Sequence, residues 1–197
     1  MSGRPFHHGN LRTVLLEQAE AVLRERGIDA LSLRELAREA GVSHGAPRSH
    51  FIDRGALLDA LAERGFTRLA DEVREAASRA PGNYARTLHA AGSAYLGFAL
   101  REPALLDLMF AAKVDGPSEA VSGAAERLFD TLTGIMSTGV EAGAYSARDV
   151  GRLTLLLGTT IHGIAAFIAS QRITTPEGEA LLDDAITLFV AGASARR

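Results

Sequence analysis

The fold is decided by the stretch Leu31-Ser32-Leu33-Arg34-Glu35-Leu36-Ala37-Arg38-Glu39-Ala40-Gly41-Val42-Ser43. Its apolar residues recur at the three- and four-residue spacing of one face of a helix. Ser32 and Glu35 have the Ser-x-x-Glu spacing of a capping box, and Gly41 predicts the end of the helix that they begin. Ser43 follows almost at once and can cap a further short helix. Two short helices joined by a glycine turn predict a helix-turn-helix.

The pattern stays helical on both sides of this stretch. Upstream, Asn10 can cap a helix that Gly27 ends. Elsewhere alanine is abundant and the alternation typical of strands is scarce, which favours helices. We therefore predict an all-α protein of about nine helices. The expected helices span about residues 10–26, 32–41, 43–51, 54–79, 84–101, 103–112, 118–142, 147–171 and 176–193.

The charges support a division into two domains, an N-terminal helix-turn-helix domain (1–52) and a larger C-terminal helical domain (53–197). The formal net charge of −3 does not by itself suggest a nucleic-acid binder. However, residues 1–54 contain eight arginines against seven acidic residues, so the acidic excess lies in the rest of the chain. This asymmetry is mild, but its sign suits an N-terminal domain that meets phosphate.

Several classes of protein are disfavoured by the composition. The chain has no cysteine, which excludes disulfides, thiolate metal sites and cysteine nucleophiles. The N-terminus lacks the apolar core of a signal peptide, so nothing argues for export and a cytoplasmic protein is expected. The most apolar segment, 152–172, contains threonines and a histidine, and we interpret it as a buried helix and not a membrane span. No metal or cofactor site is expected.

The predicted helix-turn-helix also suggests which residues meet DNA. A helix that enters the major groove must present small or polar groups at its start, and helix N-termini attract phosphate. Basic and histidine side chains nearby can add phosphate contacts, although an arginine such as Arg34 beside Glu35 more often marks a solvated helix face. The predicted DNA contacts are Arg4, Ser32, Arg34, Ser43, His44, Gly45, Arg48, Ser49, His50 and Arg54.

The segment 31–43, together with the downstream motif Pro47-x-x-His50-Phe51-x-x-Arg54-x-x-Leu57-Leu58, resembles the helix-turn-helix of the TetR family of transcriptional regulators. The similarity covers about residues 6–66. Where the family usually has a tyrosine that contacts phosphate, this chain has Arg48, which can also donate to phosphate. The opening segment 6–12 and the later Ile161-His162-Gly163 resemble one subgroup whose sensor domain carries a His-Gly pair.

This resemblance implies a homodimeric repressor that binds a palindromic DNA operator and is released by a small-molecule effector. It also implies that the last two helices form the dimer interface and that an effector pocket lies within the C-terminal domain. Aromatic and methionine residues there are more often core, and His162 is more often a core histidine bonded to a backbone carbonyl. The predicted pocket residues are Phe98, Leu105, Met109, Phe129, Met136 and His162.

Two other functions stay open at this point. A small helical enzyme could use His89 or His162 as an acid-base group, but the sequence offers no Ser/His/Asp constellation, phosphate loop or metal spacing. The neighbouring carboxylates Asp183 and Asp184 fall on an expected surface. The other alternative is a partner-binding scaffold that keeps the helix-turn-helix but has lost DNA affinity. We expect a regulator and no enzymatic activity.

Overall fold

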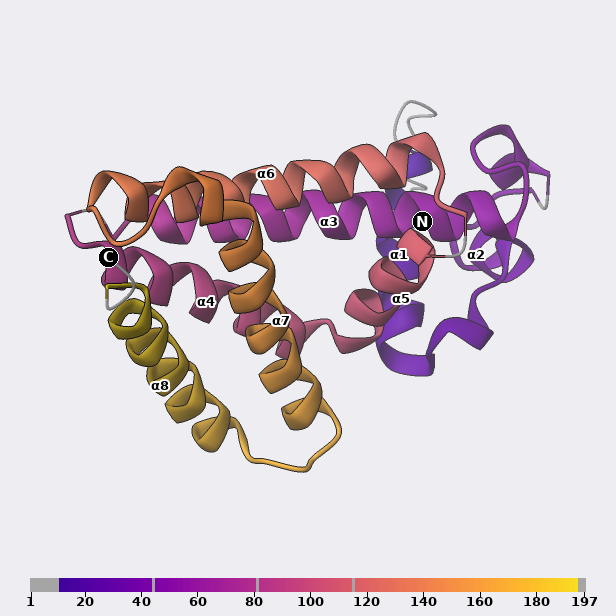
Figure 1. Ribbon diagram of the computed structural model, residues 1–197. Helices are drawn as coiled ribbons and strands as arrows, with labels where there is room; N and C mark the ends of the chain where they lie inside the picture. The colour runs from indigo at the N-terminus through magenta and orange to yellow at the C-terminus, as the bar shows by residue number, and fades with distance from the viewer. Residues whose placement is uncertain (1–10, 44, 81, 115, 195–197) are drawn as a thin grey trace. The chain divides into compact units, whose positions relative to one another are not determined.

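The computed structural model describes residues 11–43, 45–80, 82–114 and 116–194 (Figure 1). In these ranges eight α-helices and three 3₁₀ helices occur and no strand, which confirms the all-α prediction. The expected cap Asn10 lies outside the described residues. The elements are α1 (Leu11–Arg26), η2 (Ile28–Ala30), α2 (Leu33–Glu39), η3 (Ala46–Ser49), α3 (Arg54–Ser78), α4 (Tyr84–Arg101), α5 (Pro103–Val114), α6 (Glu119–Glu141), η4 (Ala147–Asp149), α7 (Val150–Ala169) and α8 (Thr175–Ser194).

The chain forms two compact units, each made of two separate segments. The first unit contains the residues up to Gly65 and the segment Ala104–Gly123, and the second contains Phe66–Pro103 and the residues from Ala124 onward. The boundary expected between residues 52 and 53 therefore falls inside the first unit. The reason is that α3 continues this unit as far as Gly65, with Leu57 and Leu61 fully buried.

In the first unit, α1 packs on α2 and on η3. Leu15, Ala19 and Leu23 lie one helical turn apart on α1 and are buried, as an amphipathic helix requires. Phe51 is also buried, and the Arg12 guanidinium lies 5.5 Å from the centre of its ring. These contacts fix the segments that carry the helix-turn-helix.

In the second unit, α4, α7 and α8 pack on one another. Figure 1 shows α7 and α8 as an antiparallel pair joined by a short loop. The helix starts are set by local chemistry: the Asn83 side chain accepts a hydrogen bond from the Ala85 amide at 2.8 Å and so caps α4. Pro103 occupies the first position of α5, where the missing N–H costs nothing.

A cluster of two tyrosines joins α4 to α6 and to the loop that follows α6. The hydroxyls of Tyr84 and Tyr145 are hydrogen-bonded, and Tyr145 donates to the Met136 carbonyl at 2.6 Å. Burial raises the pKa of both phenols. Gly139 faces this cluster closely: a Cβ built there would lie 2.5 Å from the Tyr145 hydroxyl oxygen and 2.6 Å from Cζ of Tyr84.

We expect Gly139→Ala to lower the free energy of unfolding by about 1–3 kcal/mol, because the added methyl group overpacks the tyrosine cluster. Gly134, on the same helix, is the matched control, since it is exposed and its built Cβ meets nothing within 4 Å. Gly134→Ala should raise stability by about 0.5–1 kcal/mol through helix propensity. Urea unfolding curves measure both changes, and equal stability of the two variants would contradict the described packing.

The helix α7 has two different apolar faces. Among the described residues, the stretch Ala147–Ala169 is long and apolar enough to cross a membrane, with 33% of its window buried. Leu153, Leu157 and Ile161 form a buried stripe in the unit where α7 packs on α4 and α8. Other residues on the helix, Leu155 and Leu156 among them, are exposed. The prediction of a buried helix is therefore right for one face only.

Candidate nucleic-acid interface

The start of α2 differs from the predicted capping box. Ser32 occupies the N-cap position with extended backbone, but its side chain makes no capping hydrogen bond. Glu35 instead accepts a hydrogen bond from Nε of Arg38 at 3.2 Å, and this interaction lowers the pKa of Glu35 below its usual range. The capping-box prediction is wrong: the Glu35 carboxylate binds the Arg38 guanidinium, and Ser32 makes no capping hydrogen bond. The Ser32 side chain lies exposed.

The segment after the turn is shorter than predicted. In place of an α-helix over 43–51 that Ser43 caps, the described residues of this segment, 43 and 45–51, contain the 3₁₀ helix η3, with Gly45 at its N-cap position. Pro47 has no N–H to donate, and glycine disfavours helix, so an α-helix does not propagate here. The Pro47 carbonyl accepts from the amides of both His50 and Phe51, at 3.0 and 2.8 Å. The order of a helix-turn-helix is kept, with a single tight turn in place of the recognition helix.

The outer side of this turn is polar and open. Pro47 is its buried residue, and the small residues Gly45 and Ala46 leave the backbone near its start accessible. Ser49 donates a hydrogen bond to the Ala46 carbonyl at 2.7 Å, which holds its hydroxyl against the turn. The predicted contacts at Arg4 and His44 lie outside the described residues. Those that the structure leaves exposed around the turn are Ser43, Gly45, Arg48, Ser49 and His50.

A basic groove brings together three of the predicted DNA-binding side chains. The groove has a volume of about 620 Å³, and Arg34 of α2, Arg48 of η3 and Arg54 of α3 all line it. Asp53 is the acidic residue of the lining, so cations predominate. A concave surface lined by three arginines suits the phosphates of a nucleic-acid backbone. The remaining lining residues are Leu33, Gly45 and Ile52.

Arg54 has a structural task in addition to its charge. Its Nε donates to the Leu31 carbonyl at 3.0 Å, and a terminal nitrogen donates to the Ile28 carbonyl at 2.6 Å. Next to it, Asp53 caps α3 by accepting from the Ala56 amide at 2.8 Å. Arg54 therefore anchors the start of α3 to the segment before α2. Arg34 and Arg48 are the exposed cations that remain the better predictions for phosphate contact.

The predicted effector residues are divided between the two units. Leu105 and Met109 belong to the first unit, whereas the other four belong to the second. Met109 is fully buried and lies against Gly65, where a built Cβ would be 2.5 Å from its sulfur. Phe98 is fully buried with the Arg68 guanidinium 5.1 Å from its ring centre. These contacts are those of core residues, and a ligand contact there stays a prediction.

Two predicted effector residues do lie near a cavity. A small apolar cavity of about 40 Å³ lies among α4, α6 and α7, and Met136 and Tyr95 both line it. The Tyr95 hydroxyl and Nδ1 of His162 share a hydrogen bond of 2.9 Å, and burial raises the pKa of Tyr95. The other lining residues are Leu88, Ala91, Gly92, Leu132, Ile135, Thr154, Leu157, Gly158 and Ile161. Tyr95 thus lines a mostly apolar space, and the His162 imidazole is hydrogen-bonded to its phenol.

The structure brings together a Ser/His/Asp group that the sequence does not reveal. His89 and Ser93 lie one turn apart on α4, with Ser93 Oγ 3.4 Å from Nδ1, while Nε2 of His89 contacts the Asp183 carboxylate on α8. The sequence does not reveal this group because helix packing brings it together. All three side chains are exposed, whereas a catalytic triad works as a pre-organised and largely desolvated group. The group ties α4 to α8.

A helix-turn-helix with a basic groove, in a chain whose other unit is a helical bundle with an internal cavity, defines a DNA-binding regulator. Comparison with family models agrees. The model for bacterial regulatory proteins of the tetR family matches residues 15–61, and the tetracyclin repressor-like C-terminal domain matches residues 88–189. The chain therefore belongs to the TetR family of transcriptional regulators, a family of DNA-binding proteins and not of enzymes.

Individual proteins are similar to this chain over most of its length. A protein of unknown function from Rhodococcus sp. RHA1 has 40% identity and a TM-score of 0.88, covering 96% of this chain and 98% of that one. The TetR-family regulator PfmR from Thermus thermophilus has 19% identity and a TM-score of 0.66, with coverages of 90% and 97%. The uncharacterised HTH-type transcriptional regulator YobS of Bacillus subtilis (strain 168) is 22% identical over 169 residues, 86% of this chain and 84% of YobS. The His-Gly subgroup stays a prediction.

Proposed function

We propose that this regulator is a ligand-responsive repressor that acts in the cytoplasm as a homodimer on a palindromic operator. The observation that carries the proposal is the apolar cavity in the second unit, with the Tyr95 and His162 pair at its edge. Cavities of this kind inside helical bundles are common ligand sites. DNA binding itself follows from the family, so the proposal concerns how it is controlled and assembled.

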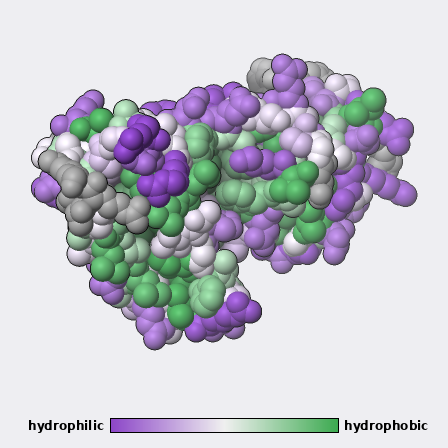
Figure 2. All heavy atoms as spheres, viewed as in Figure 1, coloured by the Kyte–Doolittle hydropathy of each residue, from purple (hydrophilic) through white to green (hydrophobic). Residues whose placement is uncertain are grey.

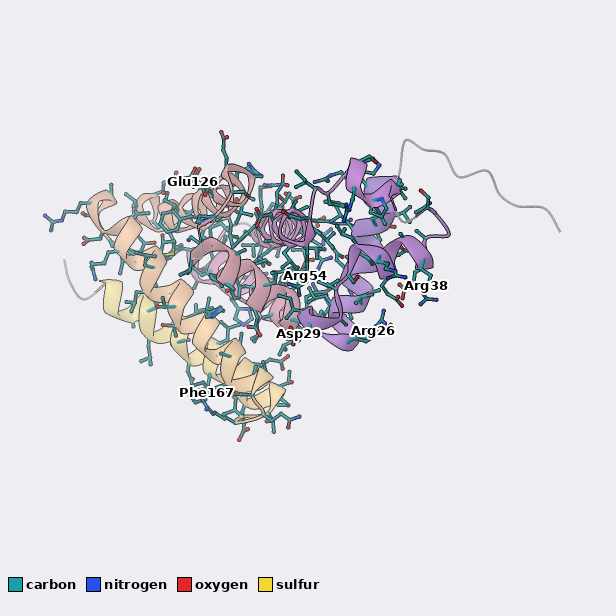
Figure 3. The ribbon with its side chains drawn as sticks, turned by 90° about the vertical axis from the view of Figure 1, so that its right-hand side faces the viewer. Arg26, Asp29, Arg38, Arg54, Glu126 and Phe167 are labelled. Carbon is teal, nitrogen blue, oxygen red and sulfur yellow. The ribbon has the colours of Figure 1, made fainter. Side chains whose placement is uncertain are left out.

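The outer faces of α7 and α8 support dimerisation. Figure 2 shows apolar side chains gathered over these two helices, and Phe167 points outward from α7 in Figure 3. A continuous apolar face of this kind on a soluble protein usually marks an interface. Two helix-turn-helix segments related by a twofold axis then match the two halves of a palindromic operator. The exposed apolar residues are Leu155, Leu156 and Phe167 of α7 and Leu181 and Leu188 of α8, with exposures of 58%, 51%, 48%, 44% and 72%.

The size of the cavity supports a two-state mechanism. At about 40 Å³ it holds little more than one water molecule, whereas ligand pockets have volumes of about 300–1,000 Å³. An effector would therefore bind a second state in which the α4, α6 and α7 contacts have opened. Binding controls DNA affinity only through its preference for that state, with a typical coupling of about 1–3 kcal/mol. We infer a small apolar effector that carries one hydrogen-bonding group for Tyr95 and His162.

The test combines a mobility shift on the DNA upstream of the regulator's own gene with mass spectrometry of any small molecule that co-purifies. We expect a sequence-specific shift at fixed salt and its reversal by the identified compound. Tyr95→Phe, which removes only the hydroxyl, should raise the compound concentration needed for release and leave DNA affinity unchanged. A compound that binds the protein without altering the shift would rule out the proposed control.

A further inference from the structure

An exposed isoleucine lies in the basic groove that the predicted DNA contacts line. Ile52 stands in the loop between η3 and α3, and 81% of its surface is exposed. It lines the same groove as Arg34 and Arg48. An exposed isoleucine forgoes the stabilisation that burial would give it, although single exposed apolar residues are ordinary on protein surfaces. The position of this one among arginines that face a polyanion is what calls for an explanation.

The backbone on both sides of Ile52 is fixed. Before it, the Phe51 amide donates to the Pro47 carbonyl at 2.8 Å and the Phe51 ring is buried. After it, Asp53 caps α3 and Arg54 donates to two backbone carbonyls of the preceding segment. Since both neighbours are anchored, Ile52 is presented outward by the fold and is not a side chain that has failed to reach the core.

We propose that Ile52 is an apolar contact to the DNA backbone, packing on a deoxyribose between the phosphates that Arg34 and Arg48 bind. Along a DNA strand the charged phosphates alternate with largely apolar sugars, so a surface with two guanidinium groups and an aliphatic side chain complements that alternation. The inference goes beyond the proposed control by an effector and rests only on DNA binding. It assigns to Ile52 a part of the affinity for DNA that depends neither on the DNA sequence nor on the salt concentration.

Two properties distinguish this contact from those of the arginines. Deoxyribose is the same in every nucleotide, so the contact stabilises specific and non-specific complexes alike. Isoleucine carries no charge. The number of counterions released when the protein binds DNA is therefore the same without it, and the dependence of affinity on salt concentration does not change. By contrast, removing an arginine that binds a phosphate makes the affinity depend less on salt concentration.

The experiment measures the affinity of the full chain for the upstream operator duplex and for a scrambled duplex over a range of salt concentrations. We expect Ile52→Ala to weaken binding about three- to tenfold on both duplexes, with unchanged salt slopes. Ile52→Val should retain most of the affinity. The matched control is Val114→Ala, because Val114 of α5 is 79% exposed in the same unit and lies outside the lining of the groove, and it should not change binding.

Several outcomes would overturn the assignment. Unchanged affinity in Ile52→Ala would remove the contact altogether. A loss on the operator duplex alone would place Ile52 on a base. If the unaltered protein then loses the same affinity on an operator with deoxyuridine in place of thymidine, the base contact is with the thymine methyl group. A smaller salt slope would mean that the substitution displaces an arginine. If the unaltered protein shifts neither duplex, DNA binding itself fails, which is a different result.

Discussion

The double variant Leu156→Glu/Leu188→Glu is expected to be a monomer that binds the operator about 100-fold more weakly, or worse. Leu156 and Leu188 are exposed on the apolar faces of α7 and α8, and both line a depression of about 510 Å³ beside Phe189. In a dimer through these helices the two glutamates of each copy would lose much of their hydration within an apolar interface, which is strongly unfavourable. A monomer has one head and reads only half of a palindrome, so most specific affinity disappears.

Sedimentation velocity measures the state of association, and a mobility shift measures the affinity. Thermal unfolding of the variant monitors the fold, which should persist because neither side chain belongs to the buried core. Val114→Glu is the control, since it places the same charge on another highly exposed apolar residue, in the first unit. A Leu156→Glu/Leu188→Glu protein that still sediments as a dimer would show that the interface lies elsewhere.

The second large effect concerns the basic groove. Arg34→Ala/Arg48→Ala should weaken operator binding about 100-fold at moderate salt, because a dimer loses four charge-assisted contacts to phosphate. It should also flatten the plot of log affinity against log salt concentration by about 3–4, at about 0.9 per phosphate on B-DNA. Both side chains are exposed, so stability should change little.

Arg38→Ala is the control for this experiment. Arg38 lies on the same short helix as Arg34, but it forms an ion pair with Glu35 and does not line the groove. We therefore expect it to change the salt slope by less than one. If Arg34→Ala/Arg48→Ala and Arg38→Ala flatten the slope equally, the arginines act through overall charge and the groove has no special role.

Helix boundaries could be predicted from the sequence where short-range chemistry sets them. Asp53 caps α3, Pro103 begins α5, and α4 spans the expected residues 84–101. The same kind of reasoning is wrong at η3. Gly41 and Ser43 suggest that an α-helix starts there, whereas Gly45 and Pro47 prevent it. Competing local signals of similar strength can be ranked only when the surrounding backbone bonds are known.

The candidate site could be predicted in its residue types but not in its arrangement. Arg34, Arg48 and Arg54 are all expected from the helix-turn-helix pattern, yet only the structure shows that Arg54 is held by backbone carbonyls. Ile52 escapes prediction because its exposure depends on how Phe51 and Asp53 are anchored. The effector residues are mixed between two units for a similar reason, since apolar residue types do not reveal which cavity they line.

The single turn η3 bears on how proteins of this kind diverge. Pro47 is the buried residue of that turn, and the bonds that hold it there come from backbone groups. Substitutions at positions 45 and 49 therefore alter what the helix-turn-helix presents to DNA without repacking its core, and surface changes of this kind rarely alter stability by more than about 0.5 kcal/mol. Descendants of one ancestral regulator could acquire new sets of target genes by a few such exchanges while their folds stay intact.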